Sequence, residues 1–331
     1  DYGHGLFLSR KEANDWFLVK MAHENGYLII AMDWRGMSKY DLPVIVKALM
    51  TQPTLIEAMR DNLIQGYSNK LALQHFAKNG LLAMPWMQFG SLSSNTAQSP
   101  NSGTAAEPSM IFYGISQGGI LGSGYVALLG ETKLIDRAIL GVPGTPFALV
   151  MSRSSDFVMY NKLMLFNYYT NRHVRVFISM LQMAFDSVGA SGHLATPIAQ
   201  HSKTDDSIPR VLLQAGLGDT QVNSLAAELL SRAYGASVLP GNPRKDVFGL
   251  SVEQPANSTY DGPRSALTEI LYKDDMASLP KTNIAPKRRN RVHLCVRLDS
   301  NLERQVVEFI NKGKIIDPCA NGACIKRRAR C

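Results

Sequence analysis

The chain has 331 residues, of which 45% are hydrophobic and 19% are charged, as in a globular protein with one large or two smaller domains. No stretch approaches about 18 consecutive apolar residues, which disfavours a membrane-spanning helix. The formal net charge is +8, but no zinc finger, RNA-binding aromatic pair or basic heptad accompanies the basic residues, so no nucleic-acid partner is expected.

Short apolar segments punctuated by glycine alternate with amphipathic stretches along most of the chain. Helices are expected over residues 11–25, most of 42–79, 120–129, 222–234 and a stretch that ends at Gly313, and strands over 27–32, 109–113, 134–142, 211–215 and 268–272. This alternation is typical of an α/β fold with a mostly parallel central sheet and helices on both faces.

Two segments interrupt the alternation. Residues 90–108 are rich in Ser, Asn, Gly and Ala and predict a surface loop. Residues 145–205 contain a region dense in Phe, Tyr and Met, and predict an inserted cap. These side chains either line an apolar ligand pocket or form the cap's own small core. The expected organisation is a core in two parts, 1–144 and 206–313, with the cap at 145–205 between them and a Cys-containing basic tail at 314–331.

The pentapeptide at 114–118, Gly-Ile-Ser-Gln-Gly, fits the pattern G-x-S-x-G. Its context is what makes it informative, because an apolar strand precedes it and a helix follows it. In such a nucleophile elbow the serine occupies a strained turn that lifts its hydroxyl above the sheet, and the flanking glycines avoid collisions with neighbouring backbone. We therefore predict that Ser116 is a nucleophile. The alternative is a glycine-rich turn without chemistry.

A serine nucleophile needs a base and an acid that orients the base. When the chain order is Ser, then acid, then His, the acid follows a strand well beyond the serine. The apolar run 211–215 and a glycine-containing turn lead to Asp219, which we predict to be the acid. His293 is the only histidine after Asp219, so it is the predicted base.

Other roles remain open for both residues. Asp219 could instead cap the helix expected from residue 222, and His293 could be a surface histidine in a basic loop. Asp205, Asp206 and Asp246 are rival acids, the first two early in the chain and the third in a loop containing Pro and Gly.

An oxyanion formed at the serine requires preorganised backbone N–H donors. One should come from Gln117, the residue after the serine, and the second from a His-Gly loop that follows an early strand. Residues 2–7 read Tyr-Gly-His-Gly-Leu-Phe, which makes Leu6 the predicted second donor and His4 a residue that orders the loop. The strand expected before this loop and a signal peptide are both missing, so we expect a longer precursor that holds them.

All four cysteines lie in the last 37 residues, and their spacing lacks the C-x2-C pairs of zinc sites. We predict disulfides, with three pairings open, no metal, and a secreted or periplasmic protein. Basic clusters lie at residues 287–289 and 326–330. They predict a solvated loop and a frayed terminus, or peripheral contact with an anionic surface.

Together these segments resemble the α/β-hydrolase superfamily, in particular secreted or periplasmic microbial serine esterases and lipases. The resemblance rests on YGHGLF at 2–7, DWRGMS at 33–38, YGISQGG at 113–119, LLQAGLGD at 212–219 and RVHLCVR at 291–297. It implies a Ser116–His293–Asp219 triad, no cofactor, and hydrolysis of a small-molecule or lipid carboxylic ester. The sequence does not indicate the oligomeric state.

Rival functions on the same fold are a peptidase, a thioesterase or a polyester depolymerase, since one triad serves all acyl transfers. A non-catalytic binding protein with this fold is a rival of a different class. If the aromatic cap forms the acyl pocket, the substrate is an ester with an apolar acyl or aryl part.

Overall fold

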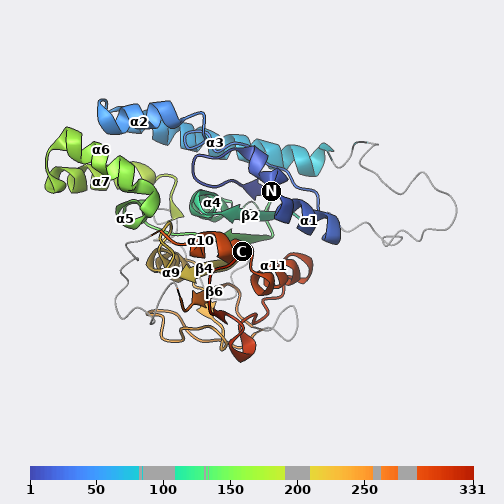
Figure 1. Cartoon of the computed structure of the whole chain (residues 1–331). Helices are drawn as coiled ribbons and strands as arrows, with labels where there is room; N and C mark the ends of the chain where they lie inside the picture. The colour runs from blue at the N-terminus through green and yellow to red at the C-terminus, as the bar shows by residue number, and fades with distance from the viewer. Residues whose placement is uncertain are drawn as a thin grey trace.

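The structure, a computed structural model, describes residues 1–81, 84, 109–129, 132, 134–190, 209–255, 262–274 and 289–331 (Figure 1). The loop predicted at 90–108 lies outside these residues, as do Asp205, Asp206 and the first two residues of the basic cluster at 287–289.

A seven-stranded parallel sheet forms the centre of the described chain, in the order β1-β2-β3-β4-β6-β5, with β7 also paired to β6. The strands are β1 (Tyr2–Gly3), β2 (Ile111–Ile115), β3 (Arg137–Gly141), β4 (Arg210–Leu217), β5 (Ser237–Val238), β6 (Ala266–Tyr272) and β7 (Ile325–Lys326). Since parallel strands need long crossover connections, the connecting helices must lie on the faces of the sheet.

Helices cover both faces of the sheet (Figure 1). One face is covered by α2 (Leu42–Met50), α3 (Leu55–Asn79), α4 (Gln117–Leu128) and α9 (Ser224–Ala233), and the other by α1 (Trp16–Asn25), α10 (Val292–Arg297) and α11 (Ser300–Lys312). The predicted fold class, α/β with a mostly parallel sheet between helices, is confirmed. None of the described helices is both long and apolar enough to cross a bilayer.

The strands separate two apolar cores by the two-residue periodicity of their side chains. On β4, Val211 and Leu213 belong to the core under α3, α4 and α9, whereas Leu212 belongs to the core under α1, α10 and α11. All three side chains are fully buried. A strand buried on both faces must be apolar at nearly every position, which explains the continuous apolar run in the sequence.

Several predicted elements differ from the observed ones. The strand expected at 27–32 is wrong, because only Ala31 forms a bridge, to Tyr2 of the two-residue strand β1. The helix expected at 11–25 is divided at Asp15, whose backbone is extended, into a 3-10 helix η1 (Arg10–Asn14) and α1. The two-residue strand β1 precedes the His-Gly loop and pairs with β2.

Between β3 and β4 the described chain is helical, with α5 (Phe147–Arg153), η5 (Ser155–Phe157), α6 (Val158–Tyr168) and α7 (Asn171–Phe185). Buried aromatic side chains of this segment stack on one another. Phe147 lies parallel to Phe185 with ring centroids 4.0 Å apart, and Phe157 packs edge-on against Phe147. These side chains belong to the same apolar core as the side chains under α3, α4 and α9, so the segment packs on the body of the protein.

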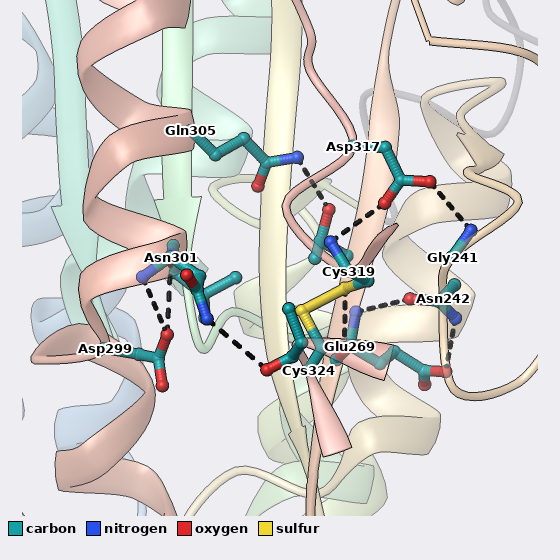
Figure 2. The surroundings of a disulfide bond; sticks show 12 residues. Gly241, Asn242, Glu269, Asp299, Asn301, Gln305, Asp317, Cys319 and Cys324 are labelled. Carbon is teal, nitrogen blue, oxygen red and sulfur yellow. Dashed lines mark hydrogen bonds between the residues drawn. A yellow bond between two sulfur atoms is a disulfide. The ribbon is translucent and has the colours of Figure 1, made fainter. Parts of the chain in front are cut away.

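The C-terminal segment is built into the fold instead of fraying. Strand β7 pairs with β6, and the disulfide Cys319–Cys324 closes the turn before it (Figure 2). A second disulfide, Cys295–Cys331, joins the end of the chain to α10, which lies beside it in Figure 1. Lys326 forms an ion pair with Asp299. The predicted disulfides are present, and this pairing is one of the three that the sequence left open.

Glu269 of β6 is completely buried beside the disulfide Cys319–Cys324 (Figure 2). Its Oε2 accepts a hydrogen bond from Asn242 Nδ2 at 3.1 Å, while its Oε1 has no hydrogen-bond partner among the residues that the structure describes. Burial raises the pKa of Glu269 from 4.5 to about 7, against the opposing effect of the positive charge on Arg244.

We expect Glu269 to make the protein less stable as pH rises. A carboxyl whose pKa is higher in the folded state stabilises that state below the unfolded pKa, and this contribution is lost between pH 4.5 and about 7. The loss amounts to up to about 3 kcal/mol in the free energy of unfolding. Urea unfolding at several pH values should show that Glu269→Gln removes this decrease. If the variant and the parent keep the same pH dependence, Glu269 is not the responsible group.

Candidate active site

Ser116 lies in the turn between β2 and α4, with a positive φ of 58° and ψ of −122°. The flanking glycines permit this turn, because a Cβ at Gly114 would lie 2.2 Å from the backbone oxygen of Gly118, and one at Gly118 would lie 2.0 Å from that of Gly3. Ser116 therefore lies at the N-terminus of α4 in a conformation that a non-glycine residue rarely adopts.

Asp219 and His293 meet at the end of β4, although 74 positions separate them in the sequence. The ring Nδ1 of His293 lies 2.7 Å from Asp219 Oδ2. The other carboxylate oxygen, Oδ1, accepts hydrogen bonds from the backbone N–H groups of Gln221 and Val222. Both side chains are buried, so this contact is shielded from water.

The alternative roles for Asp219 and His293 do not fit this geometry. The N-cap of α9 is Asn223, whose side chain accepts a hydrogen bond from Ala226 N–H at 3.1 Å, so Asp219 is not the helix cap. Among the rival acids, Asp246 is exposed and the His293 ring bonds to Asp219 instead. His293 is not a surface histidine but the second residue of α10, in a position expected to be a loop.

Close packing of α10 on β4 brings the ring to the carboxylate. A Cβ at Gly216 would lie 2.4 Å from the Val292 side chain, so only glycine allows α10 this near to the strand. Asn290, just before α10, donates from Nδ2 to the Gly218 backbone oxygen at 2.8 Å and accepts from Val292 N–H at 3.3 Å. The turn that carries Asp219 is thereby tied to the segment that carries His293.

Ser116 and His293 line one cavity of about 550 Å³. Its described lining is Gly5, Leu6, Leu8, Glu12, Ser116, Asp156, Gln221, Arg289, Asn290, Arg291, His293, Leu294 and Arg297. No hydrogen bond joins the Ser116 hydroxyl to the ring of His293 within the described part of the chain. A second cavity, of about 340 Å³ beside α1 and β1, has neither residue in its described lining.

The loop after β1 is held by two buried side chains. His4 accepts a hydrogen bond from Trp34 N–H at Nε2, so its Nδ1 carries the proton and donates to the Gly5 backbone oxygen. Burial lowers the pKa of His4, which favours this neutral ring. Gln117 accepts from Phe7 N–H and donates to the Met37 backbone oxygen. His4 thus orders the loop, as predicted.

The two predicted oxyanion donors differ in their surroundings. Leu6 lines the cavity, and Gln117 directly follows Ser116 as the first residue of α4. Within the described chain, neither backbone N–H has a recorded hydrogen-bond acceptor. The first N–H groups of a helix lack partners within the helix and carry partial positive charge, so the Gln117 N–H is available to an anion.

Glu12 is a site residue that the sequence analysis missed. Its buried carboxylate accepts from Gly5 N–H at 2.6 Å and from Arg297 Nη1 at 3.0 Å. Gly5 belongs to the loop with Leu6, and Arg297 lies one helical turn after His293. One side chain therefore connects the loop to α10, and no local pattern predicts this because Arg297 is 285 positions away.

No family model matches the chain, and no curated protein matches it either. Among solved structures, it is similar to carboxyl esterase 2 from the mycorrhizal fungus Tuber melanosporum, with 15% sequence identity over 93% of this chain and 73% of that chain. The TM-score is 0.41.

Gly216→Ala should destabilise the protein by about 1–3 kcal/mol, because the added methyl group overlaps Val292 and forces α10 away from β4. Urea unfolding measures this loss, and Val292→Ala in the same chain should recover part of it. The control is Glu57→Ala, at an exposed position of α3, which should leave the free energy of unfolding nearly unchanged. An unchanged midpoint in Gly216→Ala would contradict the close packing described.

Glu12→Ala should lower the free energy of unfolding by about 1–3 kcal/mol, because it leaves Gly5 N–H and the Arg297 guanidinium without their acceptor. Glu12→Gln keeps one acceptor oxygen and should lose less. Urea unfolding of both variants beside Glu57→Ala, an exposed position on α3, tests the expectation. Equal stability of Glu12→Ala and Glu57→Ala would show that the connection contributes nothing.

Proposed function

We propose that this protein is a serine hydrolase that cleaves carboxylic esters, with Ser116 as nucleophile, His293 as base and Asp219 as the residue that orients the base. The observation that carries the proposal is the buried contact of 2.7 Å between His293 Nδ1 and Asp219 Oδ2, made by a ring that shares a cavity with Ser116. The strained backbone of Ser116 supports the same assignment, since strained residues cluster at functional sites.

The proton transfers follow from the hydrogen bonds. An ionised Asp219 only accepts, so Nδ1 of His293 carries a proton and Nε2 is the free base. As Ser116 Oγ attacks the acyl carbon, Nε2 takes the hydroxyl proton, and it returns this proton to the alkoxide that leaves. Water then attacks the acyl-enzyme through the same two transfers, which releases the carboxylic acid and restores Ser116.

In this proposal the backbone N–H groups of Leu6 and Gln117 stabilise the negative charge on the tetrahedral oxyanion. Both N–H groups are available for this role, because neither has another hydrogen-bond acceptor in the described chain. Donors that are already oriented need no reorganisation during the reaction, which is why such groups contribute strongly to catalysis. The loop contacts of Gln117 and Glu12 hold Leu6 in place.

The substrate is a small-molecule or lipid ester, and residues 145–205 act as a cap. Two disulfides support export to an oxidising compartment, outside the cell or in the periplasm. A peptidase, thioesterase or polyester depolymerase uses the same chemistry, so the acyl-group panel below separates these rivals from an esterase.

Ser116→Ala should abolish both labelling by a fluorophosphonate and hydrolysis of 4-nitrophenyl esters, because the attacking oxygen is removed. Asp219→Asn should keep the fold but lower kcat by about 10³- to 10⁴-fold, since the ring then adopts the wrong tautomer. His293→Gln should have a comparable effect. Rates are measured with acyl groups of increasing length, and with peptide, thioester and polyester substrates.

Matched controls are Ser179→Ala and His173→Ala, both at exposed positions of α7. Each should label and hydrolyse like the parent. Labelling that persists in Ser116→Ala would refute the nucleophile. A parent that neither labels nor hydrolyses any acyl substrate would instead favour the non-catalytic binding protein.

A further inference from the structure

Among the described residues, the lining of the candidate-site cavity carries more cationic than anionic side chains. Three arginines lie on it, Arg289, Arg291 and Arg297, against two carboxylates, Glu12 and Asp156. The apolar side chains in its described lining are three leucines, and none of the Phe, Tyr or Met side chains described between residues 147 and 190 lines it. This composition does not suit a long apolar acyl group, which binds in a pocket walled mainly by hydrophobic side chains.

The three arginines differ in how fully their charge is compensated. Arg297 is paired with the buried Glu12 at 3.0 Å. Arg289 lies 3.6 Å from Asp156 and its side chain is 71% exposed, so this pair contributes little. Asp156 is also bound by Gln221 Nε2 at 2.8 Å.

Arg291 has no side-chain carboxylate as partner among the described residues. It donates from Nη2 to the backbone oxygen of Cys331, which leaves the rest of its planar fork of donors available. Two arginines beside the site therefore keep guanidinium N–H donors that can bind an anionic group.

The turn that carries Asp219 fixes the position of Arg289 and Arg291. Both flank Asn290, whose side chain donates to the Gly218 backbone oxygen and whose N–H lies 3.4 Å from Thr220 Oγ1. The backbone of residues 289–291 is therefore anchored next to Asp219. This anchoring holds two guanidinium groups on the cavity that contains the nucleophile.

We propose that the substrate is an ester that carries a negatively charged group, which Arg289 and Arg291 bind while the ester carbonyl lies at Ser116. This inference rests on the proposed esterase function and specifies its substrate class. Guanidinium groups bind carboxylates through two parallel hydrogen bonds, which orient the substrate as well as attract it. Arg297 remains paired with Glu12 and takes no part.

The test compares two esters with acyl chains of equal length, the mono(4-nitrophenyl) ester of adipic acid and 4-nitrophenyl hexanoate. They differ by one carboxylate at the end of the acyl chain. A second pair, 4-acetoxybenzoate and 4-acetoxybenzamide, places the charge on the alcohol side. We expect kcat/KM to favour the charged member of at least one pair by about threefold or more, and the preference to fall between ~0.01 M and ~1 M salt.

Arg291→Gln and Arg289→Gln should each reduce kcat/KM for the charged ester by a larger factor than for the neutral one, mainly through KM. Arg291→Glu should reverse the preference, so that the neutral ester becomes the better substrate. The matched control is Arg304→Gln, an exposed arginine of α11 outside the cavity lining, which should keep the parent's ratio.

The outcomes separate this inference from the proposed function. Ser116-dependent hydrolysis of neutral esters, with no preference for the charged member of either pair, overturns the anionic substrate and leaves the hydrolase standing. A charge preference that survives both arginine substitutions overturns the assigned residues. Absence of Ser116-dependent hydrolysis for every ester overturns both proposals.

Discussion

The hydrogen bond between Asp219 and His293 is the interaction on which the site depends. It joins the end of β4 to α10 and fixes which ring nitrogen of His293 carries the proton. Burial makes it directional and strong, because no water competes for the carboxylate. Two backbone N–H groups satisfy the other oxygen of Asp219, so the carboxylate cannot rotate away from the ring without losing them.

Three contacts hold Asp219 and His293 in place relative to the turn that carries Ser116. Gly216 allows α10 to lie against β4, Asn290 binds the turn that carries Asp219, and Glu12 links α10 to the loop after β1. Each contact joins segments that are far apart in sequence. The site is therefore assembled by the parallel sheet, which brings the ends of β1, β2 and β4 to one edge.

The aromatic residues between β3 and β4 show how composition can mislead. A segment dense in Phe, Tyr and Met is consistent with an apolar ligand pocket, but its buried rings stack on each other, as Phe147 does on Phe185. The cavity beside Ser116 is instead lined by arginines, carboxylates and leucines. The sequence does not show whether an aromatic side chain lines a ligand pocket or packs in a core. Only the packing in the tertiary structure separates these two roles.

The sequence by itself determined the α/β class, the serine turn and the order of the candidate acid and base. These follow from local rules, since strand runs, glycine spacing and chain order are visible within a few residues. Only the tertiary structure decided that Asn223 caps α9, that His293 lies on a helix, and that Glu12 contacts Arg297. The Asn223 cap is a local contact, but the residue types alone left Asp219 as a competing cap. The contact between Glu12 and Arg297 joins segments 285 positions apart, which no local periodicity encodes.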